Sequence, residues 1–437
     1  MNVEGNIAAA TARIAALNPA YRAFSHLARD APAVAAVLQR ELDSGKTRGP
    51  LHGLAVSIKG NIPVAGLPWT EGSAIHSGRV ARQDAAIVAL ARAAGGVVLG
   101  TTTLSELAMY GVTNAFEPMG LNPWDIGRTA GGSSTGAAVA AALGMAQVNI
   151  GSDSGGSIRN PACHCGVVGF MPRIGALALG GGPNHTPSLS SIGLIGCRVG
   201  EVQTAFRALC GAADGEAPAR RLLVPRRLIE RMCDDETRVL FCDALERIAR
   251  ADFEIIEREI PGWTEGERAA GVVSLFESGQ ALARMDLSRA GTGIRARAAA
   301  AAKLTAAQVD SAHADREVLR RSFSSALQLT QADAVATPTW PFAAPHLEAQ
   351  TVVVAGASVP VDPHRNCFVR AANAIDACAI TLPMGLYPAA GVPAGLHLTG
   401  EGGSEMRLLA AAHLIEAAIP PLPPAPALTI DRKEMSP

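Results

Sequence analysis

Aromatic and charged side chains are scarce in this sequence of 437 residues. Aromatic residues make up 4% and charged residues 18%, whereas 48% of the residues are hydrophobic. This composition excludes the disordered class, and the length is ample for a large core. Length alone favours two or three domains. Because alanine and glycine replace aromatic rings, we expect an interior of small side chains that pack closely.

The chain also lacks an excess of either charge. Its 38 Lys and Arg residues balance 39 Asp and Glu residues, which gives a formal net charge of −1. No basic run stands out that could follow a phosphate backbone. We therefore do not expect nucleic acid as a direct ligand.

A signal sequence and a membrane-spanning run are also missing from the pattern. Residues 1–24 have an acidic residue early and arginines between the apolar positions, which favours an amphipathic helix over a signal sequence. The longest apolar run, residues 137–148, has about half of the ~20 residues needed to cross a bilayer. We therefore expect a cytoplasmic protein with no membrane partner.

The cysteines are scattered rather than paired at the spacings of a disulfide or zinc motif. There are eight, at positions 163, 165, 197, 210, 233, 242, 367 and 378. In a long chain without a signal sequence they are predicted to be buried thiols. Cys163-His164-Cys165 lacks a second Cys/His pair at zinc-site spacing, and structural zinc needs four ligands. We expect core packing there and no metal.

Helical and short apolar segments alternate along the first part of the chain. Residues 6–45 have helical spacing, and "LHGLAVSIKG" predicts a short strand that ends at Lys59. Residues 84–94 predict a helix, and "GGVVLGTTT" predicts a buried strand after a turn. This alternation indicates an α/β sheet covered by helices.

Glycine and serine concentrate in two loops after residue 130. The first, residues 131–136, opens an Ala-rich helix whose first-turn amides we expect Ser or Thr hydroxyls to cap. "QVNIG" predicts a strand, followed by the second loop, residues 151–157. From about 205 to 335 longer amphipathic helices such as 236–250 and 306–328 dominate, and late strands follow.

The second loop contains "SDSGGS", residues 152–157, but familiar serine catalysis does not fit it. The letters Asp-Ser-Gly-Gly would make Ser154 a protease nucleophile, yet the histidine base, the all-β double barrel and the disulfides are missing. A Gly-x-Ser-x-Gly elbow is excluded because Asp153 stands where its serine would be. A Ser-x-x-Lys dyad is absent at Lys59.

Two Gly-Gly-Ser loops 24 residues apart, with a lone lysine upstream, are the most specific pattern in the chain. They lie in "GGSSTGAAVAAALG" and "NIGSDSGGSIRNPACHCGVVGF", and the lysine lies in "GPLHGLAVSIKGN". Together with "SLSSIGLIG", "DAVATPTWP", "NAIDACAITLPMG" and "GVPAGLHLTG", these motifs resemble the amidase signature family over most of the chain.

The resemblance implies an α/β fold of three layers, α/β/α, with a large mixed β-sheet flanked by helices. It implies a single domain over residues 1–437. Within it we expect a catalytic core at about 50–200, a helical substrate-side region at about 205–335, and C-terminal strands and a helix at about 336–420.

Carried over residue by residue, the resemblance also implies a catalytic triad. Ser157 would be the nucleophile, Ser133 a bridging serine with a cis peptide bond to Gly132, and Lys59 the base. A lysine has an unperturbed pKa near ~10.4, so this base has to be buried in order to be neutral near pH 7. The Ser133 hydroxyl can both donate and accept, which suits a proton relay.

The second loop can also supply donors for a tetrahedral oxyanion. Backbone amides of Ser154, Gly155, Gly156 and Ser157 could point together, because glycines permit dihedral angles that side chains forbid. Ser154 would then contribute its amide rather than its hydroxyl.

Other loop residues are predicted to support the triad. Asp153 and Arg159 could brace the loop through a charge-assisted pair, a structural role rather than direct chemistry. Gly132 and Ser134 flank the bridging serine. Taken alone, Lys59 is a common kind of surface charge at a strand end, and a Gly-Ser loop before a helix is a common turn. Their combination favours the catalytic interpretation.

The chain departs from the family pattern at several positions. Gly60, Met171, Ser190 and Leu194 stand where Asp, Lys, Asp and Pro are usual in the family. The hydrogen bonding around Lys59 could therefore differ, and the substrate is left open.

The substrate pocket is predicted among three segments. Leu107 and Tyr110 belong to the first, residues 107–116, and the others are residues 183–190 and 270–345.

The predicted function is hydrolysis of a linear carboxamide, a small molecule, through an acyl-Ser157 intermediate. No metal or cofactor is expected. The resemblance implies a homodimer. Two alternatives stay open: an ammonia-supplying A-type subunit of an amidotransferase, which acts with a partner, and a hydrolase of urea-type amides. A non-catalytic relative retained for binding is a third, which the intact triad disfavours.

Overall fold

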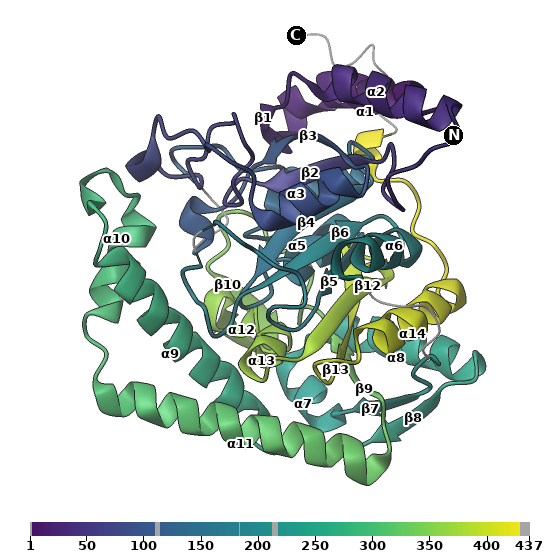
Figure 1. The fold of residues 1–437 in the computed structure, drawn as a ribbon. Helices are drawn as coiled ribbons and strands as arrows, with labels where there is room; N and C mark the ends of the chain where they lie inside the picture. The colour runs from purple at the N-terminus through teal and green to yellow at the C-terminus, as the bar shows by residue number, and fades with distance from the viewer. Residues whose placement is uncertain (1, 110–113, 183, 212–216, 429–437) are drawn as a thin grey trace.

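A mixed β-sheet runs through the protein in the computed structural model, which describes residues 2–109, 114–182, 184–211 and 217–428 (Figure 1). In these ranges the sheet has 11 strands in the order β1-β3-β2-β4-β6-β5-β12-β13-β9-β7-β8. The β2, β3 and β4 strands pair in parallel, as do β7, β8 and β9, whereas β12 pairs antiparallel with both neighbours. The prediction of a large mixed sheet is confirmed.

The strands have the following bounds: β1 (Phe24–Leu27), β2 (Ala55–Lys59), β3 (Val97–Thr102), β4 (Val148–Asp153), β5 (Val168–Met171), β6 (Ser191–Gly196), β7 (Arg221–Val224), β8 (Glu254–Glu257), β9 (Ala334–Pro338), β12 (Cys378–Leu386) and β13 (Pro393–Gly400), with β10 (Thr351–Val354) and β11 (Ala357–Pro360) in a separate hairpin.

The helices have the following bounds: α1 (Val3–Tyr21), α2 (Ala31–Asp43), α3 (Ala86–Ala93), α4 (Thr135–Ala142), α5 (Arg159–Cys165), α6 (Val199–Cys210), α7 (Arg226–Met232), α8 (Asp235–Arg250), α9 (Trp263–Leu282), α10 (Thr292–Ala301), α11 (Ala306–Thr330), α12 (Val361–His364), α13 (Val369–Ala374) and α14 (Glu405–Ala418). Single 3₁₀ turns are η1 (Ala74–His76), η2 (Glu106–Ala108), η3 (Leu287–Arg289) and η4 (Pro426–Leu428).

Side chains along the central strands point alternately to the two faces of the sheet, which divides the core into two layers. Ala55 faces the smaller cluster with α1, α2 and α4, whereas Val56 and Ile58 face the larger cluster with α3, α6, α8 and α14. Successive side chains of a strand point to opposite faces, so both faces of the sheet are apolar and both are covered by helices. This confirms the α/β/α layering.

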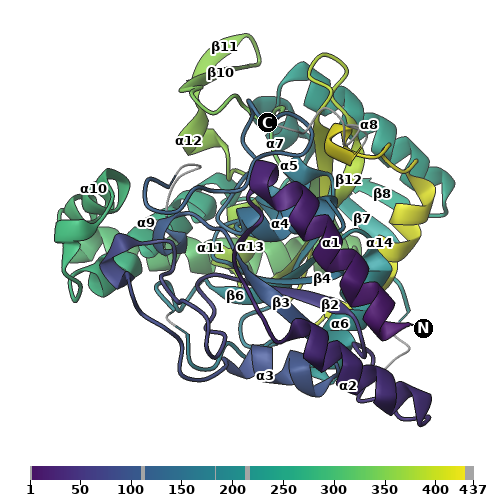
Figure 2. The same cartoon turned by 90° about the horizontal axis from the view of Figure 1, so that it is seen from above.

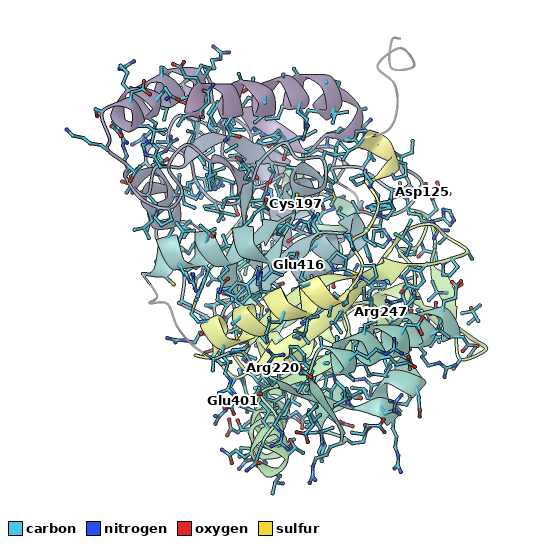
Figure 3. The ribbon with its side chains drawn as sticks, turned by 90° about the vertical axis from the view of Figure 1, so that its right-hand side faces the viewer. Asp125, Cys197, Arg220, Arg247, Glu401 and Glu416 are labelled. Atoms are coloured by element: carbon cyan, nitrogen blue, oxygen red, sulfur yellow. The ribbon has the colours of Figure 1, made fainter. Side chains whose placement is uncertain are left out.

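Figures 2 and 3 show the helices that cover the two faces of the sheet. In Figure 3, α6, α14 and α8 lie side by side over one face, with Glu416 on α14 and Arg247 on α8 labelled. In Figure 2, α1 and α2 lie toward the viewer, and the β10–β11 hairpin projects beside α12. The α9, α10 and α11 helices extend to one side of the sheet (Figure 1).

Two local predictions were wrong. Helices dominate the region 205–335, as predicted, with the short strands β7 and β8 among them. Residues 6–45, however, contain the strand β1 between two helices. The α4 helix has no side-chain cap from Ser134, because the Ser134 hydroxyl donates to the Ser152 carbonyl oxygen at 3.2 Å instead.

All eight cysteines are free thiols, as predicted. Five are buried, as expected, but the prediction of burial was wrong for Cys210 and Cys242, which are half-buried, and for Cys197, which is exposed. Cys163, His164 and Cys165 lie in the core, where the His164 ring packs 4.5 Å from the Trp340 ring. Within the described ranges no helix is long and apolar enough to cross a membrane.

Parallel pairing brings distant residues to one edge of the sheet. The β2 and β4 strands run side by side, with Val56 opposite Val148 and Ile58 opposite Ile150. Their carboxyl ends therefore lie next to each other, which places Lys59 beside Ser152. The α4 helix packs against both strands, and the loop before it reaches the same edge.

The close packing of α4 depends on glycine. A Cβ atom at Gly136 would lie 2.2 Å from the Ala23 carbonyl oxygen and 2.6 Å from the Thr103 amide nitrogen, whereas one at Gly200 in α6 would meet nothing within 4 Å. Gly136→Ala is expected to lower the free energy of unfolding by ~1–3 kcal/mol, since backbone has to move. Gly200→Ala should leave it unchanged or raise it by up to ~1 kcal/mol. Urea unfolding checks both, and equal effects of the two substitutions would contradict this account.

Candidate active site

Lys59 ends β2 with its side chain fully buried. Its Nζ atom lies 2.7 Å from Ser133 Oγ, 3.0 Å from Ser152 Oγ and 3.1 Å from the Ser152 carbonyl oxygen. Burial lowers the pKa of Lys59 to about 7, although the Asp153 charge raises it. The amine is therefore available in its neutral form near neutral pH.

The three contacts of Lys59 match the hydrogen-bonding groups of a neutral amine. A neutral amine has two N–H bonds and one lone pair. If the two N–H bonds donate to the two oxygens of Ser152, the lone pair is left for the Ser133 hydroxyl. Asn61 Nδ2 also donates to Ser152 Oγ, at 3.2 Å. Sequence reasoning missed Ser152, although it is the first serine of the loop sequence "SDSGGS".

Ser133 lies in the loop before α4, and the Gly132–Ser133 peptide bond is cis. This agrees with what the resemblance implied. The next residue, Ser134, donates its backbone amide to the Ser157 carbonyl oxygen at 3.0 Å. The two Gly-Gly-Ser loops are thus joined directly, which brings Ser133 and Ser157 to the wall of the same cavity.

The amides of the second loop are divided between two acceptors. Gly155 and Gly156 donate to Asp153 Oδ1 at 3.1 and 2.7 Å. The prediction that these two amides face a substrate oxyanion is wrong for this structure, because the Asp153 carboxylate accepts them. The amides of Ser154 and Ser157 have no acceptor among the described residues, so these two are the candidates for an oxyanion site.

Asp153 and Arg159 form the buried pair that the sequence predicted. Arg159 donates from Nη2 to Asp153 Oδ1 at 3.0 Å and from Nε to Oδ2 at 3.1 Å, and neither side chain is exposed. Burial alone would raise the pKa of Asp153, but the Arg159 charge and the hydrogen bonds outweigh burial and lower this pKa. Arg159 also donates to the Val369 carbonyl oxygen and to Asn373 Oδ1, so the pair anchors the loop to α13.

A cavity of about 550 Å³ opens beside these residues. Its volume suits a small-molecule ligand. Leu107 lines it, as predicted, whereas Tyr110 lies outside the described residues. The segments 183–190 and 270–345 contribute further lining residues: Asn184, His185, Thr186, Ser190, Ser274, Arg297 and Trp340.

Two further lining segments were missed. Residues 174–179 contribute mainly apolar side chains, and residues 362–370 contribute Asp362, Arg365, Asn366 and Arg370. Neither has a motif that marks a pocket. Of the departures from the family pattern, Met171 is buried and its sulfur accepts from Asn373 Nδ2. Gly60 packs closely, since a Cβ there would lie 3.0 Å from Leu104 Cδ2 and the Thr102 carbonyl oxygen.

Comparison with known proteins gives one consistent family. The family model described as Amidase matches residues 6–409. The A subunit of glutamyl-tRNA(Gln) amidotransferase from Anaeromyxobacter sp. (strain K) is 30% identical over 472 aligned residues, which cover 96% of this chain and 94% of that protein. The corresponding protein of Anaeromyxobacter dehalogenans (strain 2CP-C) is 29% identical over the same shares.

Solved structures agree over nearly the whole chain. A crystal structure of an amidase has a TM-score of 0.90 at 27% identity and covers 96% of this chain and 97% of its own. Native peptide amidase from Stenotrophomonas maltophilia has a TM-score of 0.80 at 26% identity, covering 97% and 95%. The fold of this chain is thus that of amidases.

The buried pair at the loop makes a prediction about stability. Arg159→Met is expected to lower the free energy of unfolding by ~3–5 kcal/mol, because it leaves the Asp153 carboxylate buried without its partner. The control is Arg173→Met, which removes a pair between an Arg173 side chain that is 51% exposed and Glu405 and should cost at most ~1 kcal/mol. Urea unfolding at neutral pH measures both. A similar loss for the two variants would rule out the anchoring role of Arg159.

Proposed function

The chain belongs to the amidase family, and on that premise we propose that it cleaves a carboxamide C–N bond with Ser157 as nucleophile. Ser133 acts as the proton relay and Lys59 as the base. The observation that carries the proposal is the 2.7 Å contact between Lys59 Nζ and Ser133 Oγ, made by a buried lysine whose pKa is about 7. The Ser134 amide donates to the Ser157 carbonyl oxygen at 3.0 Å, and this contact between the two loops supports Ser157 as the nucleophile.

Acylation begins with transfer of one proton along this chain. Ser157 Oγ gives its proton to Ser133 Oγ, the Ser133 proton passes to the Lys59 amine, and Ser157 Oγ forms a bond to the amide carbon. The Ser154 and Ser157 amides donate to the oxyanion of the tetrahedral intermediate. The proton then returns through Ser133 to the leaving nitrogen, the C–N bond breaks, and an acyl-Ser157 ester remains.

Deacylation repeats the sequence with water as the nucleophile. Water gives a proton through Ser133 to Lys59 and its oxygen attacks the ester carbon. Collapse of the second intermediate releases the carboxylic acid, and the proton returns to Ser157 Oγ. The residues of this chain suffice for both steps.

The Lys59 base makes the reaction dependent on pH. A fluorophosphonate probe should form an adduct on Ser157, with a second-order rate constant that falls about tenfold for each pH unit below 7, as Lys59 becomes protonated. Lys59→Met should slow labelling at pH 8 by at least about a hundredfold. Rates and adduct sites are measured by mass spectrometry.

The matched control is Lys303→Met, which removes an exposed lysine and should not change the labelling rate. Labelling of Ser152 or Ser154 in place of Ser157, or undiminished labelling of Lys59→Met, would overturn the mechanism.

A second version of this chemistry is favoured by the sequence relatives. Both relatives above are A subunits of glutamyl-tRNA(Gln) amidotransferase and align over almost their full length. In that version Ser157 would hydrolyse an amide to supply ammonia to a partner protein. It has at least as much support as hydrolysis by the chain alone. A homodimer and a cytoplasmic location stay predictions.

Ammonia release by the purified chain distinguishes the two versions. The substrates are aliphatic, aryl and ureido amides and glutamine, with Ser157→Ala as the control for contaminating activity. We expect turnover of at least one amide without any partner, and none by Ser157→Ala. Labelling of Ser157 combined with no release from any amide would favour the amidotransferase version. A search for a co-purifying partner would then follow.

A further inference from the structure

His185 lies on the cavity wall and is held there by a buried carboxylate. It belongs to the segment between β5 and β6, and its side chain is 10% exposed. The ring Nε2 lies 3.0 Å from Glu71 Oε2, and the Glu71 side chain is only 1% exposed. This contact joins two loops that are 114 residues apart in the sequence. The orientation of the His185 ring is therefore set by the protein itself.

The segment that carries His185 is anchored on both sides of it. On the N-terminal side, the Ala86 amide donates to the Gly180 carbonyl oxygen at 2.9 Å. On the C-terminal side, Arg316 of α11 donates to the Ser188 carbonyl oxygen and to Ser188 Oγ, at 3.0 and 3.1 Å. A ring that is held in this way loses little conformational freedom when a ligand binds to it.

Glu71 also determines which ring nitrogen of His185 carries a proton. Burial alone would raise the pKa of Glu71, but contacts with His185 and Arg79 outweigh burial and lower this pKa. An ionised carboxylate only accepts, so Nε2 of His185 has to donate. Arg79 also donates to Glu71 and balances the charge of the carboxylate. A neutral His185 ring therefore satisfies the contact, and such a ring has its lone pair on Nδ1.

The Nδ1 atom of His185 is an acceptor without a partner. Among the described residues, none makes a hydrogen bond to it. Both ring nitrogens of His164 are enclosed by the protein and lack partners, whereas Nδ1 of His185 is not enclosed. Because His185 lines the cavity, a ligand in the cavity can reach this lone pair.

We propose that His185 Nδ1 accepts a hydrogen bond from an uncharged O–H or N–H group in the acyl part of the substrate amide; this rests on the proposed function. The substrate class is amides whose acyl chain carries a hydroxyl or a further N–H, rather than amides of plain hydrocarbon chains. An acceptor that is held in place and left without a donor costs a hydrogen bond. Such a site discriminates against an analogue that lacks the donor.

His185 could instead serve only as a tie between the two loops, since its contact with Glu71 joins them. A tie would affect all ligands of the cavity equally. The comparison that separates the two roles pairs amides of nearly equal shape, in which a methyl group replaces the hydroxyl or a methylene group replaces the N–H.

Ligand-observed NMR titration of the Ser157→Ala protein makes this comparison without turnover. Glycolamide, β-hydroxypropionamide and γ-hydroxybutyramide are measured against propionamide, butyramide and valeramide, and N-acetylglycinamide is measured against levulinamide. At least one donor ligand should bind about fivefold more tightly than its analogue or better, as one hydrogen bond predicts. Adding His185→Leu should reduce this ratio to below about twofold, whereas His185→Gln should retain part of it because glutamine also has an acceptor.

The control is His413→Leu, which removes an exposed histidine that does not line the cavity and should leave the ratio unchanged. Equal affinity within every pair, no measurable binding of any donor ligand, or selectivity that survives in His185→Leu would each overturn the proposal. If His185→Leu does not fold, the ratios in Ser157→Ala and in His185→Gln still decide. Fluorophosphonate labelling of Ser157 reads out the proposed function separately, so the two failures are distinguishable.

Discussion

A lysine amine enclosed by protein is the feature on which the rest of the site depends. Lys59 is fully buried at the end of β2, and burial lowers its pKa to about 7. A charged ammonium in this position would lose its hydration without gaining a carboxylate partner in contact. The surrounding serines supply what a neutral amine needs, two acceptors in Ser152 and a hydroxyl in Ser133. The site therefore does not require a histidine.

The small side chains of the chain make this burial possible. The residues of α4 from Thr135 to Ala141 are all buried, and most are alanine or glycine. Gly136 allows the helix to approach the backbone at Ala23 and Thr103, so that the loop containing Ser133 reaches Lys59. A helix of larger residues could not lie as close to the sheet. The small residues of α4 are therefore a condition for the contact between Ser133 and Lys59.

The buried charges of the site are compensated to different degrees. Asp153 and Arg159 have no exposure and satisfy each other, with further hydrogen bonds to the loop and to α13. These contacts hold the loop in place, but the Gly155 and Gly156 amides then donate to Asp153 instead of to a ligand. Arg297, at the cavity wall, has neutral acceptors instead.

Local patterns in the sequence were sufficient for features that depend on neighbouring residues. The short run of β-friendly and small residues before Lys59 predicted a strand end, and the helical spacing of 84–94 and 306–328 predicted α3 and α11. The resemblance carried by the two Gly-Gly-Ser loops supplied Ser133 and Ser157 as candidates. The edge strand β1 was hidden because four residues between two helices are too few to show a period.

The contacts that define the site were decided by tertiary structure alone. Lys59 meets Ser152 because β2 and β4 pair in parallel and in one register, and Arg297 lies beside Ser274 because α10 packs against α9. Similarly, the Asp153 carboxylate takes two of the amides expected at an oxyanion because the loop folds back over it. The sequence by itself identifies the candidate residues through their motifs. Strand register and helix packing determine which of these residues touch, since those contacts join residues far apart in the chain.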